Sequence, residues 1–189
     1  MGRYTTRSIT KEEYKEIITN LRNGYTDNEG IPHRPNNQVA DILVLEGNLG
    51  CRIGDIVKLR HDSFVCDSGI WKINIVEEKT DKKRTFIVPK KVKQFIDKLD
   101  YGKDGRIFSI GEQAVWKQLR AVTDTLGLDN VSSHSIRKMI SNQIYANSGH
   151  DIEVVCTFLQ HSSPVTSRRY IRRADEKVEK AINSAVNLL

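Results

Sequence analysis

The sequence predicts one α+β domain that is mainly helical and carries a small antiparallel β-sheet. Two patterns predict this fold class. Most of the 189 residues lie in segments whose apolar residues recur every three or four positions between capping residues, which is typical of helices. Residues 68–89 instead alternate apolar and polar side chains, as a half-buried strand does. The length suits one well-packed domain, and the chain contains no internal repeat or linker-like tract.

The first half of the chain predicts three helices. Residues 8–24 open with a capping-box pattern, in which Thr10 is followed three positions later by Glu13, and continue with an apolar stripe. A polar loop follows. Residues 38–50 predict a buried helix that ends at a glycine, and residues 52–64 predict a helix that leads into a strand.

The middle of the chain predicts the sheet. Trp71, Ile73 and Ile75 alternate with less apolar neighbours, and a second apolar run returns after a charged turn. This pattern is typical of a hairpin or of two arms of a small antiparallel sheet. Six further helices are expected, over residues 90–102, 112–127, 132–149, 151–160, 162–173 and 174–189.

Composition narrows the functional class. The formal net charge is +6 and the pI is about 9.2, which favours an anionic partner, with nucleic acid as the first candidate. No apolar run approaches the roughly 20 residues that span a bilayer, so we expect no membrane partner and a cytoplasmic location. Cys51, Cys66 and Cys156 are widely spaced and lie beside apolar residues. They predict reduced core thiols rather than a disulfide framework or a metal site.

Two short patterns could bind a phosphate. His134 and Arg137 lie three residues apart near the start of a predicted helix, where an imidazole and a guanidinium suit an anion. Arg52 follows a glycine turn in apolar surroundings, with Asp55 one turn later. The Arg52–Asp55 pair either supports the fold alone or leaves one guanidinium edge facing a ligand. Neither pattern decides the function by itself.

Three further residues could act in catalysis only if other residues of the chain lie near them. Lys79 lies in a charged β-turn, which is either a solvated tip or a mobile proton donor for a phosphate site. His161 ends an apolar helix, where a structural role is common. Tyr170 would need cations nearby to act as a nucleophile, because its ordinary pKa is near 10. The basic residues expected to contact DNA are Lys82, Lys83, Arg84, Arg168 and Arg169.

Taken in order, these residues resemble the active site of the tyrosine recombinases, the phage integrase family. The resemblance rests on six residues in the family's order and runs from about Ser8 to the tail. Residues 50–64 look like the family's first arginine box, and residues 134–171 look like its second. Gln160 replaces the usual glycine before the histidine, and Cys51 replaces a commoner leucine, which we expect to be a packing change. The six residues are Arg52, Lys79, His134, Arg137, His161 and Tyr170.

The resemblance implies DNA cleavage by transesterification. Tyr170 would attack the scissile phosphate, leaving a 3′-phosphotyrosine link and a free 5′-hydroxyl. Arg52 and Arg137 would hold the two non-bridging oxygens, where negative charge develops in the transition state.

The same resemblance assigns supporting roles. His134 would accept the tyrosine proton or hydrogen-bond the phosphate, and His161 would donate a further hydrogen bond. Lys79 would protonate the departing 5′-oxygen, and Asp55 occupies the family's usual acidic position. We expect no cofactor and no metal.

The implied partner is double-stranded DNA. The resemblance implies a homotetramer on paired DNA sites and a monomer or weak oligomer without DNA. We expect the chain to correspond to the catalytic domain, without the family's N-terminal DNA-clamping domains, and therefore to bind DNA weakly and in a salt-sensitive way. The predicted helix 174–189 either docks on a neighbouring protomer or packs on its own domain.

Three other functions compete with this one. A type IB topoisomerase uses similar chemistry to relax DNA, but the spacing of the second box favours recombination. A non-catalytic DNA-binding module, with residues 133–141 as a recognition helix, would leave Arg52, His161 and Tyr170 as coincidences. A metal hydrolase fits least, because the five histidines form no HxxxH or HExxH pattern.

Overall fold

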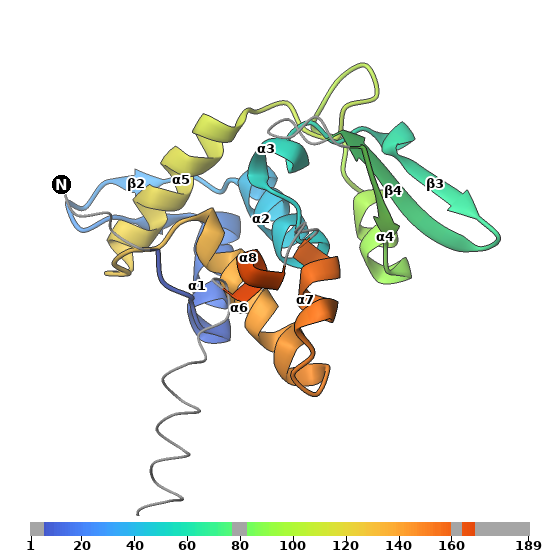
Figure 1. The fold of residues 1–189 in the computed structure, drawn as a ribbon. Helices are drawn as coiled ribbons and strands as arrows, with labels where there is room; N and C mark the ends of the chain where they lie inside the picture. The colour runs from blue at the N-terminus through green and yellow to red at the C-terminus, as the bar shows by residue number, and fades with distance from the viewer. Residues whose placement is uncertain (1–5, 77–82, 160–163, 169–189) are drawn as a thin grey trace, which may run out of the picture.

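A group of packed helices carries a three-stranded sheet that extends to one side (Figure 1). The computed structural model describes residues 6–76, 83–159 and 164–168. The expected mainly helical α+β class is confirmed. The helices are α1 (Lys11–Asn23), α2 (Asn37–Leu49), α3 (Ile53–Ile56), α4 (Lys90–Ile96), α5 (Glu112–Thr125), α6 (Ser133–Asn147), α7 (Ile152–Leu159) and α8 (Pro164–Arg168), with a 3-10 turn η1 (His61–Ser63). The strands are β1 (Tyr25–Thr26), β2 (Pro32–His33), β3 (Phe64–Asp67), β4 (Ile70–Val76) and β5 (Lys83–Ile87).

Helix α1 begins at the capping box that the sequence predicts. The Glu13 amide donates to the Thr10 hydroxyl at 3.1 Å, and the Thr10 amide donates to the Glu13 carboxylate at 2.8 Å. A cap of this kind satisfies amides that have no partner inside the helix and contributes about 1 kcal/mol. Ile17 and Leu21 are buried, so the predicted apolar stripe faces the core.

The polar loop after α1 contains a small hairpin that the sequence does not reveal. Strands β1 and β2 pair over two residues each. The Asp27 carboxylate accepts hydrogen bonds from the amides of Glu29 and Ile31 and contacts the His33 ring at 2.8 Å. The Tyr25 ring stacks on that of His33, with centroids 4.6 Å apart. Strands this short carry no detectable alternation, so the pattern is missed.

Helix α2 lies at the centre of the helical part and ends as predicted at a glycine. Gly50 has φ 63°, in the left-handed region, and its amide donates to the Glu46 carbonyl at 3.0 Å. A Cβ atom at this position would lie 2.7 Å from ring atoms of Phe158. The turn after α2 is therefore closely covered by α7.

Two helices are shorter than the sequence predicts. Helix α3 ends at Ile56 and α4 ends at Ile96, before the ends of their predicted segments. Backbone groups beyond both ends bond to Ile107 instead: the Ile107 amide donates to the Leu59 carbonyl at 3.0 Å, and the Tyr101 amide donates to the Ile107 carbonyl at 3.1 Å. Leu59 and Ile107 are far apart in the sequence, so their pairing leaves no local signal.

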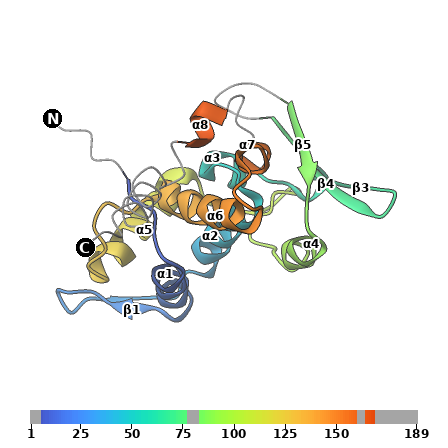
Figure 2. The same cartoon turned by 60° about the horizontal axis from the view of Figure 1, so that its bottom comes forward.

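The sheet has the order β3-β4-β5, with both pairs antiparallel. Phe64 and Ile73 pair across β3 and β4 and are buried, which ties one end of the sheet to the core. The β3–β4 hairpin then extends away from the helices (Figures 1 and 2). Cys66 lies on this arm and is exposed, so its predicted core location is wrong. Cys51 and Cys156 are buried as expected, and none of these three described cysteines forms a disulfide.

The last described helices follow their predicted signals. Helix α6 begins after Ser132 and ends just before Gly149, which has φ 66°. Helix α8 begins at Pro164, a residue that favours the first helical position. The predicted helix 174–189 lies outside the described residues. No helix in the described segments combines the length and apolarity needed to cross a bilayer.

Candidate active site

Arg52 is placed by the turn that ends α2. It occupies the N-cap position of α3, and its carbonyl accepts hydrogen bonds from the amides of Asp55 and Ile56, each at 3.0 Å. The Arg52 side chain is half-buried, whereas Asp55 is buried. The predicted first box therefore forms a short helix whose arginine stands at the start and whose acidic residue lies inside.

Helix α6 carries His134 and Arg137, and these two residues differ in how deeply they are buried. Arg137 is only 1% exposed, whereas His134 is exposed. Residues three apart on a helix differ by about 60° around its axis, so one can lie at the rim while the other points inward. The sequence predicts a shared face but not this difference in burial. A guanidinium removed from water needs nearby negative charge, either from the protein or from a ligand.

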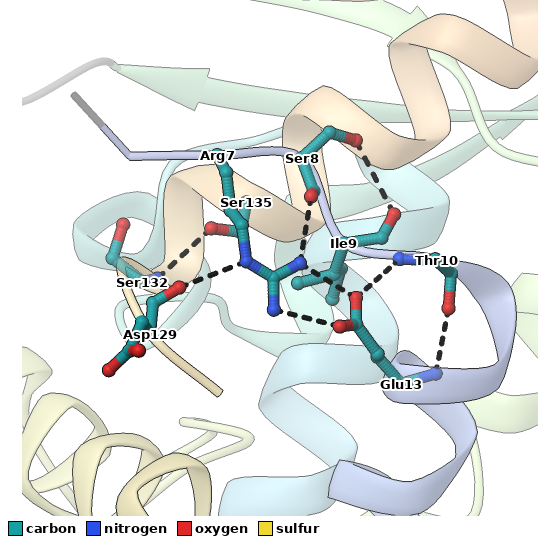
Figure 3. A network of polar contacts seen from close by, with 8 residues as sticks. All are labelled: Arg7, Ser8, Ile9, Thr10, Glu13, Asp129, Ser132 and Ser135. Carbon is teal, nitrogen blue, oxygen red and sulfur yellow. Dashed lines mark hydrogen bonds and ion pairs between the residues drawn. The ribbon is translucent and has the colours of Figure 1, made fainter. Parts of the chain in front are cut away.

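The N-terminal segment fixes the start of α6, a contact that sequence reasoning missed (Figure 3). The Arg7 guanidinium binds both Glu13 carboxylate oxygens, at 2.8 and 2.7 Å, and donates to the Asp129 carbonyl at 2.9 Å. These hydrogen bonds with Arg7 lower the pKa of Glu13. The Lys138 ammonium donates to the Thr6 carbonyl. Residues 6–9 thus connect the start of α1 to the helix that carries His134 and Arg137.

A second missed residue is Glu46, which lies on α2 with 0% exposure. Burial raises the pKa of its carboxyl group well above the ordinary value, and the charge of Arg137 opposes this effect. The signal in the sequence is a single acidic residue within the apolar run 42–49. Within a helix read as buried, such a residue marks a polar function or a buried ion pair.

The helices that carry these residues pack on one another. Helix α2 contacts both α3 and α6, so the elements bearing Arg52 and Arg137 share a neighbour. Helix α7 contacts α6 and α8, and Figure 2 shows α8 beside α7. Helix α8 ends two residues before Tyr170.

The structure describes the remaining predicted site residues to different extents. Lys83 is exposed at the start of β5, opposite Val76. Arg84 and Arg168 are placed by their backbone alone, in β5 and α8. Outside the described residues lie Lys79, Lys82, His161, Arg169 and Tyr170. In the part of the chain that is described, no three histidine, cysteine or acidic side chains gather as metal ligands would.

Comparison with known proteins adds a family and a fold. The model of the phage integrase family matches residues 7–177. The probable integrase/recombinase YoeC of Bacillus subtilis (strain 168) is 29% identical over 135 residues, which cover 66% of this chain and 71% of that protein.

Two solved structures show the same fold. XerH site-specific recombinase bound to its difH substrate matches with a TM-score of 0.64 and 18% identity, over 93% of this chain and 53% of that one. The catalytic domain of bacteriophage HP1 integrase matches with a TM-score of 0.62 and 17% identity, over 94% of each chain. The chain thus spans about half the length of XerH and nearly all of the HP1 catalytic domain.

Proposed function

Because this chain belongs to the phage integrase family, we propose that it is a site-specific DNA recombinase that cleaves and rejoins strands through a 3′-phosphotyrosine intermediate. The observation that carries this proposal is the family match over residues 7–177, which includes all six predicted catalytic residues. In this role the chain acts on double-stranded DNA, as a homotetramer on paired sites, during integration or excision of a mobile element.

The reaction exchanges one phosphate ester for another. The Tyr170 oxygen forms a bond to the scissile phosphorus as the bond to the 5′-oxygen breaks. His134 accepts the tyrosine proton, and Lys79 supplies a proton to the departing oxygen. The link between Tyr170 and DNA keeps the energy of the original ester, so the reverse attack by a 5′-hydroxyl rejoins the strand.

The two arginines stabilise the charge that develops in the transition state. Arg52 and Arg137 bind the non-bridging oxygens, and His161 donates a further hydrogen bond. The burial of Arg137 supports this role, because a fixed cation interacts more strongly with a phosphate where water is excluded. Removal of one such donor typically costs about 3–4 kcal/mol of transition-state stabilisation.

Trapping of the covalent link tests the proposal without knowledge of the target sequence. The full chain is incubated with a pool of random-sequence duplexes, the reaction is stopped with detergent, and bound DNA is digested by nuclease. We expect mass spectrometry to find a nucleotide on the peptide that contains Tyr170. Tyr170→Phe should abolish the adduct, whereas Tyr145→Phe, which removes a hydroxyl from α6, should retain it. An adduct on another residue, or none with the wild type, overturns the proposal.

The DNA recovered from the adduct distinguishes recombination from relaxation. Sequencing should reveal enrichment of one related set of sites, as a site-specific recombinase requires. Equal recovery of unrelated sequences would favour the topoisomerase alternative.

A further inference from the structure

The proposed mechanism gives no role to Glu46, a fully buried acidic residue on α2. Its side chain has 0% exposure, and among the described residues neither carboxylate oxygen has a hydrogen-bond partner. Burial of a carboxyl group without such partners is costly, so a residue of this kind is rarely accidental. A leucine at this position would fit the surrounding apolar run.

Glu46 lies on α2, the helix that contacts both α3, which begins after Arg52, and α6, which carries Arg137. Its backbone carbonyl accepts the Gly50 amide at 3.0 Å, the hydrogen bond that closes the turn leading to Arg52. The next residue, Gly47, packs directly on α6: a Cβ there would lie 3.5 Å from the Ile136 side chain, one residue before Arg137. Both Glu46 and Arg137 are almost completely removed from water.

The charges around Glu46 come from each helix that packs on α2. Arg137 on α6 favours the ionised carboxylate, whereas Glu112 on α5 and burial itself favour the protonated form. Burial, together with the charge of Glu46, raises the pKa of Tyr14 on α1. Helix α3, which also packs on α2, carries the buried carboxyl group of Asp55. Arg137 is the cation that acts on Glu46, so their charges are linked.

We propose that Glu46 is a positioning residue, which sets the effective charge and orientation with which the Arg137 guanidinium meets the DNA phosphate. This inference rests on the proposed function, in which Arg137 binds the scissile phosphate. A phosphate at Arg137 adds negative charge near Glu46 and so favours its protonation. Phosphate binding therefore takes up a proton, and an ionised Glu46 competes with DNA for Arg137.

The pH dependence of DNA affinity tests this linkage. Affinity for a fluorescein-labelled random-sequence duplex is measured in the Tyr170→Phe background, which cannot cleave, at fixed ionic strength between about pH 5 and 9. With Glu46 present, affinity should fall more steeply as pH rises, by up to about tenfold per pH unit relative to Glu46→Gln. His134 is present in both proteins, so the difference between the curves isolates Glu46.

A second carboxylate on α2 provides the matched control. Asp41 is also buried, but its carboxylate accepts hydrogen bonds from Arg22 at 2.5 Å and from the Tyr101 hydroxyl at 2.7 Å. Neither partner is a predicted catalytic residue. Asp41→Asn should keep the steep curve. Glu46→Met, which also cannot ionise, should give the same shallow curve as Glu46→Gln. Agreement between the two variants excludes a folding defect that is specific to the glutamine.

The outcomes separate this inference from the proposed function. If Glu46→Gln is folded and its curve of affinity against pH runs parallel to that of the protein with Glu46, the inference is overturned. This holds even if the wild type forms the Tyr170 adduct. Conversely, no adduct together with a difference between the curves refutes cleavage by Tyr170 but retains Glu46 as the group that controls Arg137.

Discussion

Arg137 shows at the scale of one residue what the sequence can and cannot predict. Its spacing from His134 predicts a phosphate-binding pair near a helix start, and both residues lie on α6 as expected. The sequence does not predict that Arg137 is 1% exposed while His134 is exposed, because burial depends on how α2 and α7 cover α6. Glu46 was missed for the same reason: its importance depends on a neighbour from another helix.

Replacement of Arg137 by lysine should slow cleavage far more than it weakens binding. Lysine keeps the charge but lacks the planar pair of donors that matches two phosphate oxygens. We expect Arg137→Lys to reduce the rate of Tyr170 adduct formation by about 10²–10³-fold. Gel assays of adduct against time provide the measurement. Arg120→Lys, at an exposed site on α5, should leave the rate unchanged. A rate for Arg137→Lys close to that of the wild type would remove Arg137 from the mechanism.

Glu46→Gln should change how stability depends on pH. Because the pKa of Glu46 is raised in the folded state, the folded protein holds a proton that the unfolded chain has lost above about pH 4.5. The free energy of unfolding contributed by this group is thus fully present below that pH and is lost as pH rises towards the folded pKa. Glutamine carries no such dependence.

The expected result is that Glu46→Gln gains stability relative to the wild type as pH increases above about 4.5. Urea unfolding of both proteins across this range provides the measurement. Groups with lowered pKa, such as Glu13 and Asp27, titrate in both proteins and cancel in the difference. A difference that stays constant with pH would show that the Glu46 pKa is not raised.

At the scale of elements, the sequence is informative where the signal is local. The capping box of α1, the glycine end of α2 and the proline start of α8 are all confirmed. The hairpin β1–β2 and the early ends of α3 and α4 were not predicted, because they depend on strands of two residues and on pairing with Ile107. Contacts with residues outside each helix, rather than its own sequence pattern, decide where α3 and α4 end.

Gly50→Ala tests the close packing of the turn before Arg52. The substitution forces a side chain into the left-handed region and places its Cβ 2.7 Å from the Phe158 ring. Gly127→Ala is the matched control, since its φ is 65° and nothing lies within 4 Å of its Cβ position. We expect the control to lose about 1 kcal/mol of unfolding free energy from backbone strain, and Gly50→Ala to lose at least about 1 kcal/mol more from the clash. Equal losses in thermal or urea unfolding would contradict the packing of α7 on this turn.

Arg7→Met tests the connection between the N-terminal segment and α6. The variant loses the charged hydrogen bonds to Glu13 and the contact with the Asp129 carbonyl, at a cost of about 2 kcal/mol. We expect faster hydrogen exchange of amides in the first turn of α6, including that of Ser135, and slower adduct formation. Arg120→Met loses only an exposed ion pair with Asp124 and should change neither quantity. Unchanged exchange in Arg7→Met would mean that α6 is held without this segment.

At the scale of the whole molecule, the sequence inferences come from net charge and from hydrophobic periodicity. The net charge of +6 favours nucleic acid, and the family match over residues 7–177 agrees with this class of partner. The fold class followed from periodicity, and the similarity to the HP1 catalytic domain supports it. The sequence gives no access to the DNA target, since specificity depends on surface contacts and DNA shape.

The net charge of +6 predicts DNA binding that weakens steeply with salt. Each phosphate neutralised by a lysine or arginine releases about 0.9 counterion, so the logarithm of the affinity should fall linearly with the logarithm of the salt concentration. Lys83 lies at the exposed start of β5, where we expect it to contact a DNA phosphate. Lys83→Gln should therefore reduce the slope of log affinity against log salt concentration by about 1. Fluorescence anisotropy with a random-sequence duplex measures both slopes. An affinity insensitive to salt would contradict a backbone-dominated interface.

Cleavage by Tyr170 through a phosphotyrosine determines the chemistry of the two DNA ends in the trapped complex. We expect a 3′ end bound to Tyr170 and a 5′ end with a free hydroxyl, which polynucleotide kinase labels without prior phosphatase treatment. A 5′ end that carries phosphate, with a free 3′-hydroxyl and no protein attached, would be the product of hydrolysis and would contradict the mechanism.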